Sequence, residues 1–160
     1  MTLRYDPSAP PINRGIQEHH CFGCGTLNSA GLRLEFRSYS GGVWADLRLD
    51  RRFEGYAGIV HGGVLTTMLD EAMSWAISAG GEFAVTARLA TSFKKPAVVG
   101  STLRVDGRVI ESRRRLIDTA ATIVDVDSGK LIAEGEGRFL RVSDEQARAW
   151  KKTYLGPASG

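Results

Sequence analysis

The sequence predicts an α+β fold in which one antiparallel sheet packs against a single long helix. Residues 61–79 form the only long apolar run with helical spacing, whereas residues 32–142 otherwise alternate apolar and polar positions in short runs between turns. A sheet with one apolar face must pack on something, and this helix is the only long apolar element available. We expect one domain over residues 1–160, with an irregular segment at 1–30 and a C-terminal helix and tail at 143–160.

The first element is a predicted β-hairpin. Apolar and charged residues alternate from Leu32 to Phe36 and again from Val43 to Leu49, on either side of a Ser-Gly-Gly turn at 40–42. In this register Trp44 belongs to the polar face.

The helix follows a glycine-rich loop and stops at Gly80-Gly81. The apolar stripe of this helix consists of Leu65, Leu69, Ala72 and Ala76. Asp70 borders the stripe, and Glu71 lies about 100° further round the helix. We expect Glu71 to be a solvated or interface-paired charge.

Four strands are predicted after the helix, at residues 83–94, 103–110, 116–126 and 131–142. Asp127-Ser128-Gly129-Lys130 reads as a tight hairpin turn. The second of these strands shows one apolar face, made of Leu103, Val105 and Val109.
 
The start of the helix carries the residues of greatest chemical interest. Gly62 and Gly63 follow His61 where the first N–H groups of a helix are unpaired, and without a Cβ they let a ligand carbonyl approach. Such N–H groups can stabilise an oxyanion. Asp70, partly removed from water, needs a hydrogen-bonded partner or a raised pKa, and either condition suits a residue that orients or deprotonates water.

This order of elements, with His-Gly-Gly opening the helix and an Asp nine residues after the His, resembles the hotdog-fold thioesterases of the phenylacetate-pathway type over residues 20–142. The segment Cys21-Phe22-Gly23-Cys24-Gly25 is similar to one carried by a branch of that family. The resemblance implies a sheet wrapped around the helix and a homodimer or homotetramer with shared active sites. It also implies an acyl-CoA or related thioester as substrate.

The resemblance implies a role for each matching residue. Asp70 matches the general base, or in some members the nucleophile, and the Gly62 N–H matches the oxyanion donor. His61 matches the residue that holds the thioester carbonyl or the loop around it. Thr86 matches a Ser or Thr of the neighbouring subunit that helps to place the water.

A second group of residues is expected to bind substrate: Gly63, Glu54, Lys94 and Lys95. Glu54 stands seven residues before His61, where members of the family often carry Asn or Gln. A carboxylate cannot donate the hydrogen bond that an amide would give. The two lysines supply positive charge of the kind that coenzyme A requires.

Composition excludes several other classes of protein. The net charge of +3 is mild and spread along the chain, which argues against nucleic acid as a partner. Residues 1–15 do not form a signal peptide, and no apolar run is long enough for a bilayer, so we expect no membrane association and a cytoplasmic location.

Cys21 and Cys24, with His19 and His20 beside them, allow two interpretations. C-x-x-C with further ligands is one way to build a zinc site, but no second such pair follows, and adjacent histidines rarely reach one ion together. The alternative is two reduced thiols in a tight glycine turn, as suits a cytosolic chain. We expect no metal here and no catalytic role for the thiols.

The sequence therefore predicts hydrolysis of an acyl thioester without a cofactor, because an activated water and one oxyanion hole suffice for this electrophilic carbonyl. A non-catalytic acyl-CoA binding protein of the same fold is the main alternative. A hydratase or dehydratase fits less well, since those enzymes usually place their His and Asp elsewhere.

Overall fold

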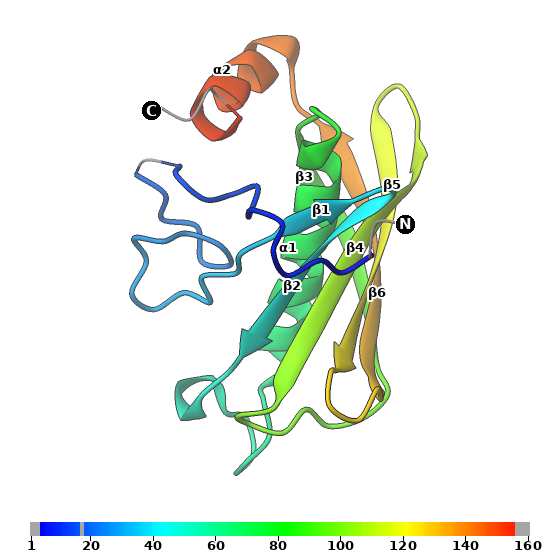
Figure 1. Ribbon diagram of the computed structural model, residues 1–160. Helices are drawn as coiled ribbons and strands as arrows, with labels where there is room; N and C mark the ends of the chain where they lie inside the picture. Colours follow the sequence, from blue (N-terminus) through cyan, green and yellow to red (C-terminus); the bar gives the residue numbers. More distant parts are fainter. Residues whose placement is uncertain (1–3, 17, 156–160) are drawn as a thin grey trace.

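The computed structural model describes residues 4–16 and 18–155. Its elements follow one another along the chain (Figure 1): β1 (Arg37–Tyr39), β2 (Gly42–Arg48), the 3-10 turn η1 (Arg51–Phe53), α1 (Gly62–Ala79), β3 (Ala84–Phe93), β4 (Thr102–Ser112), β5 (Leu116–Asp125), β6 (Leu131–Arg141) and α2 (Asp144–Tyr154). The bounds of the long helix and of the last four strands confirm the sequence prediction to within a few residues.

The six strands form one antiparallel sheet in the order β1-β2-β4-β5-β6-β3. Helix α1 lies along one face of this sheet, in the middle of the molecule (Figure 1). Residues 18–28 lie on the far side of the helix, where Cys21 and Cys24 contact it, whereas Arg4 and Tyr5 lie on the outer face of the sheet. The predicted α+β class and its sheet wrapped around a central helix are confirmed.

Helix α1 is buried along most of its length because its apolar stripe is broad. Its buried residues are Leu65, Met68, Leu69, Ala72, Met73, Trp75, Ala76 and Ile77. The approach to β4 is close: a Cβ added to Gly107 would lie 2.4 Å from the Ala72 carbonyl oxygen. Only glycine at position 107 lets the helix backbone rest on this strand.

The predicted hairpin turn is present, but its first strand lies at Arg37–Tyr39, after residues 32–36, which form no strand. Arg33 has a φ of 55°, which interrupts an extended strand. The N–H groups of Leu32 and Leu34 donate instead to the carbonyls of Phe22 and Gly23. Alternation along residues 32–36 therefore marks a buried segment that pairs with the N-terminal segment rather than with the sheet.

Trp44 is buried, which contradicts its assignment to a solvent-exposed polar face. Its relative exposure is 2%, because Tyr5 packs edge-on against its ring and the Arg37 and Arg104 guanidinium groups lie over it. Asp106 on the same face is buried for a similar reason, since it accepts hydrogen bonds from the Tyr39 hydroxyl at 3.0 Å and from Arg4. The N-terminal segment thus covers the outer face of β2 and β4.

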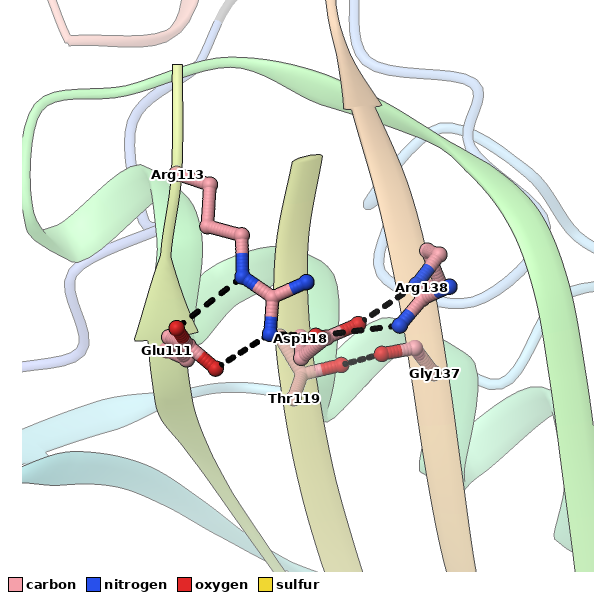
Figure 2. A network of polar contacts seen from close by, with 6 residues as sticks. All are labelled: Glu111, Arg113, Asp118, Thr119, Gly137 and Arg138. Carbon is pink, nitrogen blue, oxygen red and sulfur yellow. Dashed lines mark hydrogen bonds and ion pairs between the residues drawn. The ribbon is translucent and has the colours of Figure 1, made fainter. Parts of the chain in front are cut away.

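The outer face of β5 and β6 stays polar and is held by ion pairs (Figure 2). Arg113 binds Glu111 through two hydrogen bonds, and Arg138 binds Asp118 at 2.8 Å. The Thr119 hydroxyl donates to the Gly137 carbonyl at 3.0 Å. The charge of Arg113 is therefore already matched by a carboxylate at the β4–β5 hairpin. Val109, predicted to face the core, lies on the helix side of the sheet but is 38% exposed, because it lines an open cavity with Ala76 and Ala79 near the end of α1.

The two edges of the sheet differ. At the β1 edge, the N-terminal segment runs alongside: the Arg37 side chain donates to the Ala9 carbonyl and the Ile12 N–H donates to Phe36. Strand β3 forms the other edge and pairs only with β6 in the described part of the chain. A ten-residue strand with one open edge is a ready site for a further strand.

Helix α2 matches the predicted C-terminal helix. Its N-cap is Ser143, whose hydroxyl accepts from the Gln146 N–H. Trp150 packs edge-on against Phe83, and Tyr154 packs against His19. Within residues 4–16 and 18–155, neither helix combines the length and apolar character that a membrane span demands.

The contact between α1 and β4 predicts a strongly destabilised Gly107→Ala variant. Its Cβ would overlap a backbone carbonyl that cannot rotate away, so the loss should reach or exceed the upper end of the ~1–3 kcal/mol typical of overpacking. The free energy of unfolding, measured with denaturant at one protein concentration, tests this. Gly80→Ala is the matched control, because Gly80 has a φ of −81° and its nearest neighbour lies 3.3 Å away; its effect should stay within ~1 kcal/mol.

Candidate active site

His61 caps the start of α1 with its own side chain. Its Nδ1 accepts a hydrogen bond from the Gly63 N–H at 2.9 Å. A neutral imidazole that accepts at Nδ1 carries its proton on Nε2, so the exposed ring presents an N–H donor to a ligand. The N–H of Gly63 is already used in this cap, which corrects the expectation that Gly63 is a free donor for a substrate carbonyl.

Gly62, in contrast, keeps its N–H available. This group has no hydrogen-bond acceptor among the residues that the structure describes. The Phe93 ring lies against the same residue, and a Cβ at position 62 would sit 3.3 Å from its Cζ. Gly62 therefore presents a free helix-start N–H beside an aromatic ring that the sequence analysis did not identify.

Asp70 is partly buried on α1 and has a defined partner. The Thr86 hydroxyl, on strand β3, donates to Asp70 Oδ1 at 2.8 Å. Burial raises the pKa of Asp70, and the Thr86 hydrogen bond opposes this rise. Both residues belong to one chain, so this hydrogen bond is made within a subunit. The expected role of Thr86 in placing the water at a site shared between subunits stays a prediction.

Gly62 and Asp70 do not meet within one chain. They are eight residues apart on α1, and a rise of 1.5 Å per residue separates them by about 12 Å along the helix axis. One thioester carbonyl cannot accept from the Gly62 N–H and lie beside Asp70 of the same helix. The chain therefore carries two halves of a site: His61 with Gly62, and Asp70 with Thr86.

Glu54 is engaged within the loop that precedes α1. Its Oε1 accepts from the Gly58 N–H, and Oε2 lies 4.0 Å from Arg51 Nε. Its backbone also bridges to Val60, next to His61. These contacts assign Glu54 to positioning the loop, which differs from the direct substrate contact expected from the sequence.

Lys94 and Lys95 follow Phe93 directly and are exposed. Lys94 pairs with Glu134 at 2.7 Å, whereas Lys95 has no ion-pair partner among the described residues. The Phe93 ring lies beside Gly62 at the helix start. Lys94 and Lys95 are therefore one and two residues along the chain from this contact. Lys95 is the better placed of the two for a ligand anion.

Glu71 differs most from its expected role. It is partly buried beneath the N-terminal segment, and its Oε1 lies 3.1 Å from Cys21 Sγ. Burial raises the pKa of Glu71 to about 8. Neighbouring hydrogen bonds, first from Cys24, lower the pKa of Cys21 to about 4. A solvated charge was predicted because helical spacing cannot show that residues 18–28 cover this flank.

Comparison with known proteins shows which family the region around this site resembles. A family model described as Thioesterase superfamily matches residues 57–132, from the loop before α1 into β6. The acyl-coenzyme A thioesterase THEM4 of Bos taurus is 28% identical over 94 residues, which cover 59% of this chain and 38% of the cattle protein. The matched region thus spans less than half of that relative's length.

Several solved structures have a fold similar to that of this chain. Thioesterase superfamily protein RHA08564 is 28% identical, with a TM-score of 0.72 over 76% of this chain and 60% of its own. The PaaI protein from the phenylacetic acid degradation operon of E. coli is 22% identical, with a TM-score of 0.65 over 70% of this chain and 81% of its own. The smu.793 protein of Streptococcus mutans, solved with acetyl CoA, is 22% identical, with a TM-score of 0.64 over 69% of this chain and 89% of its own. Over residues 57–132 the chain is similar to the thioesterase superfamily, and it has the hotdog fold.

The N-cap of α1 predicts how His61 variants behave in stability. His61→Ala removes the acceptor for the Gly63 N–H and should lower the free energy of unfolding by ~1 kcal/mol. His61→Asn keeps a good capping side chain and should recover most of this loss. Denaturant unfolding of both variants at one protein concentration tests the cap. Equal losses in the two variants would show that His61 does not stabilise the helix by capping.

Proposed function

We propose that this chain hydrolyses an acyl thioester, with acyl-CoA as the first candidate, to the free acid and the thiol. The observation that carries the proposal is the Asp70–Thr86 pair at 2.8 Å on the helix whose start leaves the Gly62 N–H free. The match of residues 57–132 to the thioesterase superfamily and the name of the cattle relative support this class of reaction.

The proposed reaction needs a base, a water and an oxyanion donor. Thr86 occupies Asp70 Oδ1, which leaves Oδ2 to take a proton from water as the water oxygen bonds to the carbonyl carbon. The carbonyl oxygen becomes an oxyanion that the Gly62 N–H stabilises, with His61 Nε2–H as a second donor. Collapse of this intermediate breaks the C–S bond, and the thiolate recovers the proton from Asp70. Direct attack by the carboxylate, through an anhydride, is the alternative course at the same residue.

The separation of about 12 Å between Gly62 and Asp70 along α1 requires a second chain. A two-fold axis reverses the second helix, so that the start of one α1 can lie beside Asp70 of the other. Strand β3 offers the surface for such a pair, because its outer edge is open and Val85 and Phe93 on it are about half exposed. We propose a homodimer in which each site takes His61 and Gly62 from one subunit and Asp70 and Thr86 from its partner.

Coenzyme A would place its phosphates near the helix start. Lys95 is exposed and lies two residues from Phe93, which contacts Gly62. Lys94 would have to leave Glu134 to take part. The acetyl CoA bound to smu.793 is a property of that protein, and it supports coenzyme A as the thiol to test first.

A non-catalytic acyl-CoA binding protein is the second candidate. The observation in its favour is Glu54, whose carboxylate is held by Gly58 and Arg51 and gives the carbonyl no amide donor. Binding without turnover would leave acyl-CoA intact in the presence of the protein.

Release of free thiol from a panel of acyl-CoA thioesters tests the proposal, and Asp70→Asn gives the sharpest comparison. Asn fills the same volume but cannot accept the proton, so kcat should fall by ~10²–10⁴-fold. Asp118→Asn is the control, since this carboxylate pairs with Arg138 on the outer face of the sheet. A wild-type protein that binds acyl-CoA but releases no thiol would favour the second candidate, and an active Asp70→Asn variant would remove Asp70 from the reaction.

Mixed dimers test which residues share a site. Refolding Asp70→Asn together with Gly62→Val should restore activity, because one of the two sites in a mixed dimer then holds both intact halves. Asp70→Asn mixed with Thr86→Ala should give no gain, because these residues belong to the same half. Subunit exchange is verified by mass spectrometry of the mixture. A gain only in the second mixture would show that Thr86 acts across the interface and that the proposed halves are wrong.

A further inference from the structure

A cluster of metal-binding side chains lies on the side of α1 that faces away from the sheet. It consists of His19, Cys21 and Cys24 from the N-terminal segment, and their donor atoms all lie within 4.8 Å of one another. The proposed thioester hydrolysis uses none of them. We propose that these three residues, with Glu71 of α1 as the fourth ligand, bind one structural zinc ion. This would reverse the expectation from the sequence that the segment holds no metal.

The distances between donor atoms are close to those of a tetrahedral zinc site. With Zn–S of ~2.3 Å and Zn–N of ~2.0 Å, a tetrahedron places ligand sulfur and nitrogen ~3.5 Å apart. Cys24 Sγ and His19 Nε2 are 3.4 Å apart, and Cys21 Sγ lies 3.1 Å from Glu71 Oε1. Glu71 lies outside the group whose donor atoms are all within 4.8 Å of one another, so its carboxylate would have to shift toward Cys24 and His19 to complete the coordination.

The backbone of the cysteine turn is built to hold this arrangement. The Gly25 N–H donates to the Cys21 carbonyl at 2.8 Å, and the Leu27 N–H donates to His19. A Cβ at Gly25 would lie 2.4 Å from the Cys21 nitrogen, and one at Gly23 would lie 2.0 Å from Glu71 Cγ. Both glycines are required for the turn to fold on itself and to rest on the Glu71 side chain.

The groups around the sulfurs would stabilise thiolates. The Trp75 indole N–H donates to Cys24 Sγ at 3.3 Å. Donors of this kind are common around metal-bound thiolates, whose orientation they fix.

His19 is suited to the same ion. It is 3% exposed, and Tyr154 of α2 covers its ring. One ring nitrogen faces Cys24, whereas Nδ1 has no hydrogen-bond partner among the described residues. Burial lowers the pKa of His19, which keeps the imidazole neutral. His20 is exposed, and it points away from this cluster as adjacent residues in an extended chain do.

Two thiolates, an imidazole and a carboxylate form a donor set that zinc accepts, and redox chemistry is not needed. Binding displaces the protons held on the two sulfurs and on the Glu71 carboxyl, which pass to solvent, and forms two Zn–S, one Zn–N and one Zn–O bond. The ion would link the N-terminal segment to α1 at the residue next to Asp70. This role is structural, so it stands or falls independently of the hydrolysis.

The test uses the full chain, purified under reducing conditions without chelator and analysed for metals. We expect one zinc per chain. Protein stripped of metal should bind Co²⁺ with a sulfur-to-cobalt charge-transfer band that saturates at one equivalent, and added zinc should abolish this band and raise Tm. Cys24→Ser should lose the band, whereas His20→Ala, the adjacent control, should keep it.

Three results would overturn the proposal. One is a reduced wild-type protein that shows no charge-transfer band with Co²⁺. Another is a band of equal strength in Cys24→Ser. The third is a purified protein without metal whose mass shows the loss of two hydrogens from a Cys21–Cys24 disulfide. Should Cys24→Ser fail to fold, the one-equivalent saturation of the wild type decides the question alone.

Discussion

The packing of α1 directly on β4 is the contact on which the rest of the structure depends. Gly107 lets the backbones of α1 and β4 come into contact. Because β4 lies between β2 and β5, this contact holds the helix over the centre of the sheet. This position determines where each side chain of α1 points. Its apolar stripe enters the core, and the two flanks that remain are covered by different parts of the chain.

Two adjacent carboxylates show the effect. Asp70 and Glu71 are about 100° apart around the helix, so they leave the core on different sides. Asp70 reaches Thr86 on β3, near the open edge of the sheet, whereas Glu71 reaches Cys21 in the N-terminal segment. One helix thus carries a candidate reaction site and a candidate metal ligand on adjacent residues. Both sites depend on the same rotation of α1 about its axis.

Much of this arrangement could be predicted from the sequence because it depends on local patterns. The His61 to Gly63 motif placed the helix start correctly, and alternation located the last four strands. The errors concern contacts between distant segments. Trp44 and Glu71 were expected to be exposed because nothing in their neighbourhood shows that Tyr5 covers the first and Cys21 the second. Phe93 was missed for the same reason, since its contact with Gly62 joins positions far apart in sequence.

The proposed division of the reaction site between two chains is argued from the rise of an α-helix, and it is the central claim. The most direct measurement is a crystal structure with a thioether analogue of acyl-CoA that keeps the carbonyl but cannot be hydrolysed. A shared site predicts a carbonyl oxygen that accepts from the Gly62 N–H of one chain, with the carbonyl carbon beside Asp70 of the other. A carbonyl bound next to Asp70 and Thr86 with no helix start of a second chain near it would contradict the shared site.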